Sequence, residues 1–246
     1  MPGVSGFLTE VYVGAYDWTT TLRSADPEAS QDIADVSTFR VRGKQKLGLQ
    51  DEGKASLEGV WSYSADAGVT PGPEEFWTGI FDARTETPLT IARDGGDLGD
   101  SCICMRFRTG SYKNISKTDD AIRFTVEVNT SQGGVDFGKV AKAIGAVTVD
   151  GTDSAVDLGL DLGAGRAYLH VFAKSGTAPT LDVTIEHSDD GATGWAAAAS
   201  FAQVSAIGWQ VIDIASLKQH VRVKTDVGGT SPSFNFAVAV CPRTRF

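Results

Sequence analysis

Residues 54–61 read Lys-Ala-Ser-Leu-Glu-Gly-Val-Trp, and small or apolar residues alternate there with mostly polar ones. Successive side chains of a β-strand point to opposite faces of a sheet, so this alternation predicts a strand with one buried and one solvated face. The same alternation recurs over residues 102–108 and 122–129. Helical spacing is nearly absent from the chain, and the sequence therefore predicts a mainly β protein.

One short helix is expected after Pro71-Gly72-Pro73. Glutamates at positions 74 and 75 occupy its first turn, where acidic side chains interact favourably with the helix dipole. Apolar residues then follow at helical spacing, namely Phe76, Trp77, Ile80 and Phe81. A helix of about ten residues is marginal alone, so this aromatic stripe is expected to pack on the sheet.

The composition changes after Gly145. Residues 146–246 hold short alternating segments separated by turns, for example residues 181–186 and 221–225. Short strands with regularly spaced turns are typical of a β-sandwich. We therefore expect two domains, residues 1–147 and residues 148–246, with a β-sandwich in the second.

The chain carries 31 acidic and 22 basic side chains, a formal net charge of -9, and the basic residues are not clustered. Affinity for nucleic acid arises mainly from basic side chains that release counterions from phosphates, so this pattern argues against a nucleic-acid-binding protein. The sequence also lacks a signal peptide and the apolar run of roughly 18 residues that a membrane span needs. We expect a soluble protein with no membrane partner.

Three cysteines are too few for a disulfide framework. Cys102 and Cys104 are two residues apart in an expected strand, and Cys241 lies near the end of the chain. Structural zinc sites use about four ligands, usually with a longer spacing between paired cysteines. The sequence therefore predicts reduced structural thiols and no metal site.

The histidines, His170, His187 and His220, lie in expected strands or at strand ends. His187 precedes Ser188 and Asp189, but a catalytic triad requires side chains that converge from separate elements. No convergent acid, base and nucleophile follow from the sequence. It therefore predicts no enzyme activity, no catalytic residue and no cofactor.

Two tryptophans leave an alternative function open. Trp195 and Trp209 belong to the expected C-terminal sandwich, where exposed aromatic rings can stack on sugar rings, although core packing is the commoner fate of such residues. The alternative is therefore a carbohydrate-binding or host-surface-binding module.

A long polar segment separates two expected strands. Residues 40–53 read Arg-Val-Arg-Gly-Lys-Gln-Lys-Leu-Gly-Leu-Gln-Asp-Glu-Gly, which is too long for a two-residue hairpin turn. Long connections in compact domains are usually functional or disordered, and both interpretations remain open at this point.

Several ordered motifs together carry a family resemblance. They are Ser24-Ala-Asp-Pro-Glu-Ala-Ser-Gln-Asp, Asp35-Val-Ser-Thr-Phe, Gly48-Leu-Gln-Asp-Glu-Gly-Lys-Ala-Ser-Leu-Glu-Gly and Ser111-Tyr-Lys-Asn-Ile-Ser. With the helix at Glu74, this order resembles the major tail tube proteins of long-tailed, non-contractile (siphovirus-type) bacteriophages. The end of the chain, at residues 181–191, 221–224 and 228–231, is similar to the accessory β-sandwich that these proteins often carry.

The resemblance implies an N-terminal tail-tube β-barrel or sandwich with one short helix, and a C-terminal Ig-like or jelly-roll-like β-sandwich. It also implies hexameric rings that stack into a hollow tube through which DNA leaves the virion. In this family a long loop between two tube strands reaches neighbouring subunits, and residues 40–53 match it by position. The candidate assembly residues are Arg40, Arg42, Lys44, Lys46, Leu47, Leu49, Asp51 and Glu52.

Within such a tube, Glu58 and Glu127 are candidates for the lumen, where acidic side chains would repel phosphate. Arg106, Arg108 and Arg123 share such strand faces and depart from a purely acidic lining. The implied partners are other copies of the chain, tape measure, tail tip and terminator proteins, and DNA that passes without specific binding. The implied location is the virion tail, with synthesis and assembly in the cytoplasm of the bacterial host.

Overall fold

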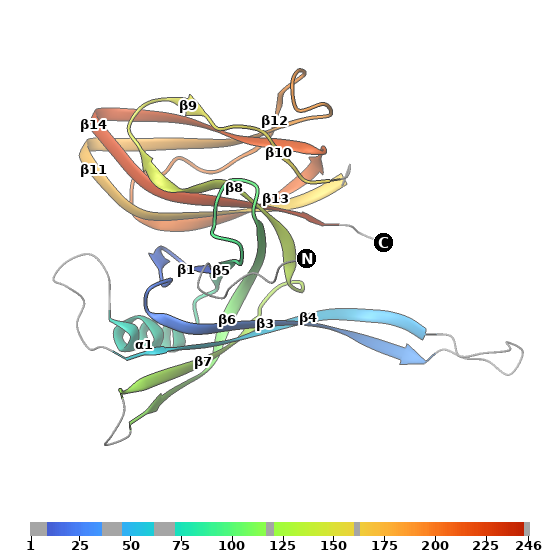
Figure 1. The fold of residues 1–246 in the computed structure, drawn as a ribbon, viewed down its shortest axis with the longest axis vertical. Coiled ribbons are helices and arrows are strands. Elements are labelled where there is room, and N and C mark those ends of the chain that lie inside the picture. Colours follow the sequence, from blue (N-terminus) through green and yellow to red (C-terminus); the bar gives the residue numbers. More distant parts are fainter. Residues whose placement is uncertain (1–8, 36–45, 62–71, 117–120, 160–162, 244–246) are drawn as a thin grey trace, which may run out of the picture. The chain divides into compact units, whose positions relative to one another are not determined.

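The computed structural model describes residues 9–35, 46–61, 72–116, 121–159 and 163–243 (Figure 1), and the side chains of residues 32–35 and 46–50 lie outside this description. The chain forms two compact units. The first unit consists of residues 1–20, 88–104 and 136–246, and the second of residues 21–87 and 105–135. The mainly β fold predicted from the alternation is confirmed, with a single helix among the described residues.

The second unit is an antiparallel sheet with one helix. Its elements are β3 (Leu22–Asp35), β4 (Lys46–Val60), α1 (Pro73–Ala83), most of β6 (Ser101–Ile115) and β7 (Arg123–Thr130). The strands are ordered β3-β4-β7-β6, so β4 and β7 lie in the middle of the sheet.

The helix forms where the sequence predicts it and covers the apolar face of this sheet. Pro73 occupies the first turn, where its missing N–H costs nothing, and Arg84 in a left-handed conformation (φ 50°) ends the helix. Phe76 and Trp77 are buried, and the Trp77 ring lies 6.3 Å from that of Phe107 on β6. The aromatic stripe therefore packs on the sheet as expected, apart from Phe81, which is exposed.

The first unit contains the remaining strands. They are β1 (Glu10–Val13), β2 (Tyr16–Asp17), β5 (Thr87–Ala92), the beginning of β6, β8 (Asp136–Val147), β9 (Gly151–Thr152), β10 (Val156–Asp157), β11 (Gly163–Ser188), β12 (Ala196–Ser200), β13 (Gly208–Leu217) and β14 (His220–Arg243). Its central feature is a long antiparallel ribbon of β11 and β14, which pair from Ala164 with Arg243 to Ser188 with His220.

The ribbon changes direction near its middle. Register shifts between Ser175 and Thr180 coincide with positive φ at Gly176 (108°) and Gly229 (105°), a backbone region that glycine adopts readily. Residues of both halves then contribute to one buried apolar cluster, with Leu169 from the first half of β11 and Val183 from its second half. The ribbon therefore forms two layers with a common core (Figure 1).

The two units do not coincide with the expected domains 1–147 and 148–246. Strand β8 ends at Val147 and pairs with β14, where Val147 lies opposite Phe234. Residues 136–147 therefore belong with the C-terminal strands. A shift in local composition could not reveal this, because the partner strand is about 90 residues away in the sequence.

His170 is fully buried in the first unit and bonded at both ring nitrogens. Its Nδ1 lies 2.6 Å from the carbonyl oxygen of Gly14, and its Nε2 lies 2.9 Å from the Thr90 hydroxyl. A carbonyl can only accept, so Nδ1–H donates to Gly14 and Nε2 accepts from Thr90. Burial lowers the pKa of His170 to about 4, although the hydrogen bond to Gly14 acts in the opposite direction.

No helix of the described residues has the length and apolar composition to cross a membrane.

We expect His170 to make the protein acid-sensitive. The pKa is lower in the folded state than the ordinary value of 6.5, so the unfolded chain binds the proton more readily. Stability should be fully present above pH 6.5 and fall by up to about 3 kcal/mol as the pH drops to 4. Urea unfolding across this range should show a smaller drop for His170→Gln. The control His220→Gln retains His170 and should keep the wild-type slope, and identical slopes in all three proteins would contradict this assignment.

The packing of α1 on the sheet should contribute to the stability of the second unit. Trp77→Ala should lower the free energy of unfolding by about 3–5 kcal/mol, because it leaves a cavity between α1 and the sheet. Phe81→Ala on the same helix is the matched control, since Phe81 is exposed, and should change stability by less than about 0.5 kcal/mol. Chemical denaturation followed by circular dichroism measures both. Equal effects of the two substitutions would show that α1 does not pack as described.

Candidate assembly surface

The uncovered side of the second unit's sheet carries a continuous set of polar residues. Side chains of directly opposed residues in antiparallel strands share a face, so the register identifies them. This polar face consists of Ser24, Asp26, Glu28, Lys54, Ser56, Glu58, Arg108, Ser111, Lys113, Arg123, Thr125, Glu127 and Asn129. Burial agrees with the register, because Phe124, Val126 and Val128 are buried whereas Glu127 and Asn129 are exposed.

Opposite charges are paired across this polar face. Lys54 Nζ lies 3.0 Å from Glu28 Oε2, and Arg123 Nη1 lies 3.5 Å from Glu58 Oε1. These side chains are between one third and two thirds exposed, so the pairs contribute at most about 1 kcal/mol each to stability. A face on which charges of both signs alternate is complementary only to a surface with the matching charge pattern.

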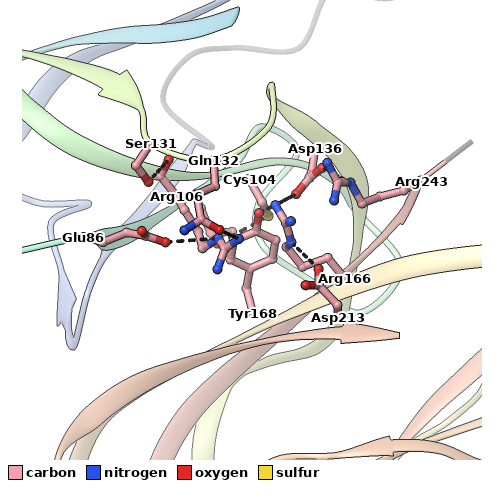
Figure 2. A network of polar contacts seen from close by, with 11 residues as sticks. Glu86, Cys104, Arg106, Ser131, Gln132, Asp136, Arg166, Tyr168, Asp213 and Arg243 are labelled. Carbon is pink, nitrogen blue, oxygen red and sulfur yellow. Dashed lines mark hydrogen bonds and ion pairs between the residues drawn. The ribbon is translucent and has the colours of Figure 1, made fainter. Parts of the chain in front are cut away.

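The register of β4 and β7 places Glu58 and Glu127, the two candidates for the lumen, on the same face, but their surroundings are not acidic overall. Glu58 is paired with Arg123, and Glu127 lies opposite Ser56 and Ser111. The arginines that share this region differ in their contacts. Arg106 pairs with Glu86 at 3.2 Å and donates a hydrogen bond to Gln132 at 2.8 Å (Figure 2).

Strand β3 forms one edge of the second unit's sheet. Among the described residues it pairs only with β4, so its outer N–H and C=O groups have no partner strand there. Pro27 lies on this strand and Arg23, Asp26 and Glu28 surround it, which is typical of an edge that resists uncontrolled pairing. A further strand can therefore pair with this edge only where it accommodates Pro27 and the neighbouring charged side chains.

The expected assembly loop is shorter than residues 40–53. Lys46, Leu47, Leu49, Asp51 and Glu52 belong to β4, where Asp51 lies opposite Gln31 and Glu52 opposite Ser30. Hydrogen bonding to β3 extends this strand in spite of its polar sequence. Asp51 and Glu52 are exposed, whereas Arg40, Arg42 and Lys44 lie outside the described residues.

Comparison with known proteins gives no family model and no curated protein that matches. Three solved structures are similar at low identity. The first is a virion protein of a gene transfer agent particle, with 15% sequence identity, a TM-score of 0.42 and coverage of 55% of this chain and 98% of that chain. The second is the SPP1 tail tube, with 6% identity, a TM-score of 0.42 and coverage of 54% of this chain and 78% of that chain. The third is the SPP1 Dit protein of a phage hub adsorption apparatus, with 9% identity, a TM-score of 0.36 and coverage of 94% of this chain and 98% of that chain. All three belong to tail or virion assemblies, but TM-scores below 0.5 do not establish a common fold.

The two tryptophans of the alternative function lie in different surroundings. Trp195 is half-buried, and the Arg222 guanidinium lies over its ring at 4.1 Å from the centroid. That guanidinium is itself paired with Glu186 at 2.7 Å, so one face of the Trp195 ring is already covered. Trp209 is half-buried beside a hollow that Leu169, Val171, Gln203 and Ala206 also line.

A buried ionic network in the first unit was not foreseen from the sequence (Figure 2). Asp136 accepts hydrogen bonds from Arg166 Nη1 at 2.9 Å and the Tyr168 hydroxyl at 2.5 Å, and it pairs with Arg243 Nε at 3.2 Å. Arg166 also donates Nε–H to Asp213 at 2.9 Å. Burial lowers the pKa of Arg166, but the Asp136 carboxylate together with Tyr168 and Asp213 outweighs burial and raises this pKa.

This ionic network joins four strands rather than forming a reactive centre. Asp136 lies on β8, Arg166 on β11, Asp213 on β13 and Arg243 on β14. Both oxygens of Asp136 are occupied by donors, and the spacing of these residues along the chain gives no local signal. The network therefore fixes the relative positions of strands that carry the C-terminal part of the chain.

The Asp136 carboxylate at the centre of this network should be important for stability. We expect Asp136→Asn to lower the free energy of unfolding by about 3–5 kcal/mol, because it leaves the buried Arg166 with an incomplete counter-charge. Asp189→Asn, which breaks the solvent-exposed pair with Lys218, is the matched control and should cost less than about 1 kcal/mol. Urea denaturation measures both, and similar losses would contradict a central role for Asp136.

Proposed function

We propose that this chain is a structural subunit of a phage tail that assembles into stacked hexameric rings and forms the hollow tube through which DNA is ejected. The observation that carries the proposal is the second unit's sheet, with a helix on one face, a charged face on the other and a charged edge at β3 that pairs with no further strand of the described residues. The ordered motifs that resemble siphovirus-type tail tube proteins lie mostly in this unit.

Edge pairing supplies the physical reason for a ring. A free strand edge is satisfied when it pairs with a strand of another subunit, and a sheet that closes on itself leaves no edge. A head-to-tail contact of this kind generates a ring when the rotation between subunits closes. The charges on β3 then select the correct neighbour and oppose random aggregation.

The charge of the polar face is compatible with a passage for DNA. Tight binding of phosphates needs a surplus of basic side chains, whereas here the pairs Lys54–Glu28 and Arg123–Glu58 neutralise each other. We propose that Glu58 and Glu127 face the lumen, where a surface without net positive charge lets the duplex slide.

The proposed division of labour assigns the tube to residues 1–147 and an accessory sandwich to residues 148–246. Because β8 pairs with β14, these two parts share strand contacts, and a truncation after residue 147 would remove the partner of β8. A structural role needs no catalytic residue and no cofactor. Other tail proteins, such as tape measure, tail tip and terminator proteins, are the proposed partners in a virion that is assembled in the bacterial host cytoplasm.

Electron microscopy of the purified chain tests the assembly. We expect rings or hollow tubes by negative stain at high protein concentration, and light scattering coupled to size exclusion should give multiples of six subunits. A chain that stays monomeric at every concentration and on addition of a preformed tail tip would contradict the proposal.

The connection between β3 and β4 should be required for tube formation. Replacing residues 36–45 with a short Asn-Gly turn leaves both described strands intact, in contrast to a deletion that extends to Gly53. We expect unchanged unfolding and no tubes. Shortening residues 62–71 by the same length is the matched control and should leave tubes intact. Normal tubes from the first variant would remove the assembly role of this segment.

The alternative, a carbohydrate-binding or host-surface-binding module of a phage tail, is favoured by one observation, the hollow beside Trp209. If it binds sugars, a panel of saccharides should shift the tryptophan emission of the wild type and not of Trp209→Ala. Trp195→Ala is the control, because the Trp195 ring is already covered by Arg222. An unshifted wild-type spectrum with every sugar would exclude this alternative.

A further inference from the structure

Three thiols converge in the interior of the first unit. Cys102 and Cys104 on β6 and Cys241 on β14 are all buried, and their sulfur atoms lie within 4.8 Å of one another. The Sγ atoms of Cys102 and Cys104 are 3.8 Å apart. Nothing in the sequence brings Cys241 to the other two, which precede it by more than 130 residues.

The sheet register explains the convergence. Strand β8 lies between β6 and β14, and its Gly138 is paired with Cys102 on one side. On the other side, a Cβ atom at Gly138 would lie 2.6 Å from the sulfur of Cys241 and 2.3 Å from the carbonyl oxygen of Val240. Only glycine fits here, and its missing side chain leaves Cys102 and Cys241 free to approach each other across β8.

The side chains around the three thiols are mainly apolar, and Thr90 and Tyr168 each bring a hydroxyl. Ala92, Val140 and Ala239 pack around them. The Thr90 hydroxyl, which donates its proton to His170, lies 3.4 Å from the sulfur of Cys104 and can accept a hydrogen bond from its thiol. Among the described residues, no histidine or carboxylate joins the three sulfurs as a further ligand.

We propose that Cys102, Cys104 and Cys241 form a buried site for one thiophilic metal ion, Cu(I). Thiolate ligands select soft ions such as Cu(I) and zinc. Two metal–sulfur bonds of about 2.3 Å at a tetrahedral or trigonal centre place their sulfurs about 3.8–4.0 Å apart, which matches the separation of Cys102 and Cys104.

The number of ligands decides between the two ions. Zinc in structural sites takes four protein ligands, whereas Cu(I) is satisfied by three sulfurs, and three is what the site offers. On binding, each coordinating thiol releases its proton to solvent and donates a sulfur electron pair to the ion. Copper enters and remains as Cu(I), so the step requires no oxidant or reductant.

Anaerobic competition tests the site in the full-length reduced protein. Cu(I) is added in the presence of bathocuproine disulfonate, and the protein should withdraw one equivalent of copper from this chelator. X-ray absorption should then show sulfur-only coordination at about 2.3 Å. The thermal unfolding midpoint should rise with added Cu(I), because the ion binds only the folded site. Failure to compete for one equivalent would overturn the proposal.

Variants separate a built site from adventitious binding to thiols. Cys241→Ala and Cys102→Ala should each weaken Cu(I) binding at least about 100-fold, and both place an alanine among neighbouring alanines. Val140→Ala in the same cluster is the matched control and should bind copper as the wild type does. Circular dichroism identifies any variant that fails to fold, and the remaining variant then decides. Unchanged affinity in a folded cysteine variant would overturn the site.

A parallel titration with Zn²⁺, using 4-(2-pyridylazo)resorcinol as the competitor, tests the choice of ion. We expect the protein to leave zinc with this chelator. Stoichiometric zinc binding without copper binding would overturn the assignment to Cu(I).

Discussion

The pairing of β11 with β14 is the interaction on which the rest of the first unit depends. It runs from Ala164 with Arg243 to Ser188 with His220, and every other C-terminal strand adds to one of its two halves. The ribbon folds back near Gly176 and Gly229, so the apolar faces of its halves meet in one core. Because backbone hydrogen bonds are satisfied along its length, the ribbon can carry isolated features such as the Asp136 network and the Cys241 thiol.

The two faces of the second unit's sheet show how one strand pattern serves two purposes. In β7, Phe124, Val126 and Val128 are buried, whereas Thr125 and Glu127 between them lie on the polar face. The buried face stabilises the unit through contacts such as Trp77 with Phe107. The outer face contributes little to stability, and its charge pattern is the one on which the proposed contact between subunits rests.

The charged groups of the two units differ in their burial. In the first unit Asp136, Arg166 and His170 are buried and fully bonded, so their loss would leave unpaired polar groups in the interior. In the second unit the ion pairs are solvated and exchangeable. Buried, bonded charges therefore contribute to stability in the first unit, whereas the exposed pairs of the second unit contribute little to it.

Local signals in the sequence, namely alternation and helical spacing, were enough to predict the mainly β fold and the helix after Pro73. The tertiary structure alone decided that β4 begins at Lys46, that β8 joins the C-terminal strands and that Cys241 meets Cys102. These features depend on which distant strands pair and in what register. That choice depends on the packing of whole faces and the hydrogen bonding of partner strands, which no short stretch of sequence contains.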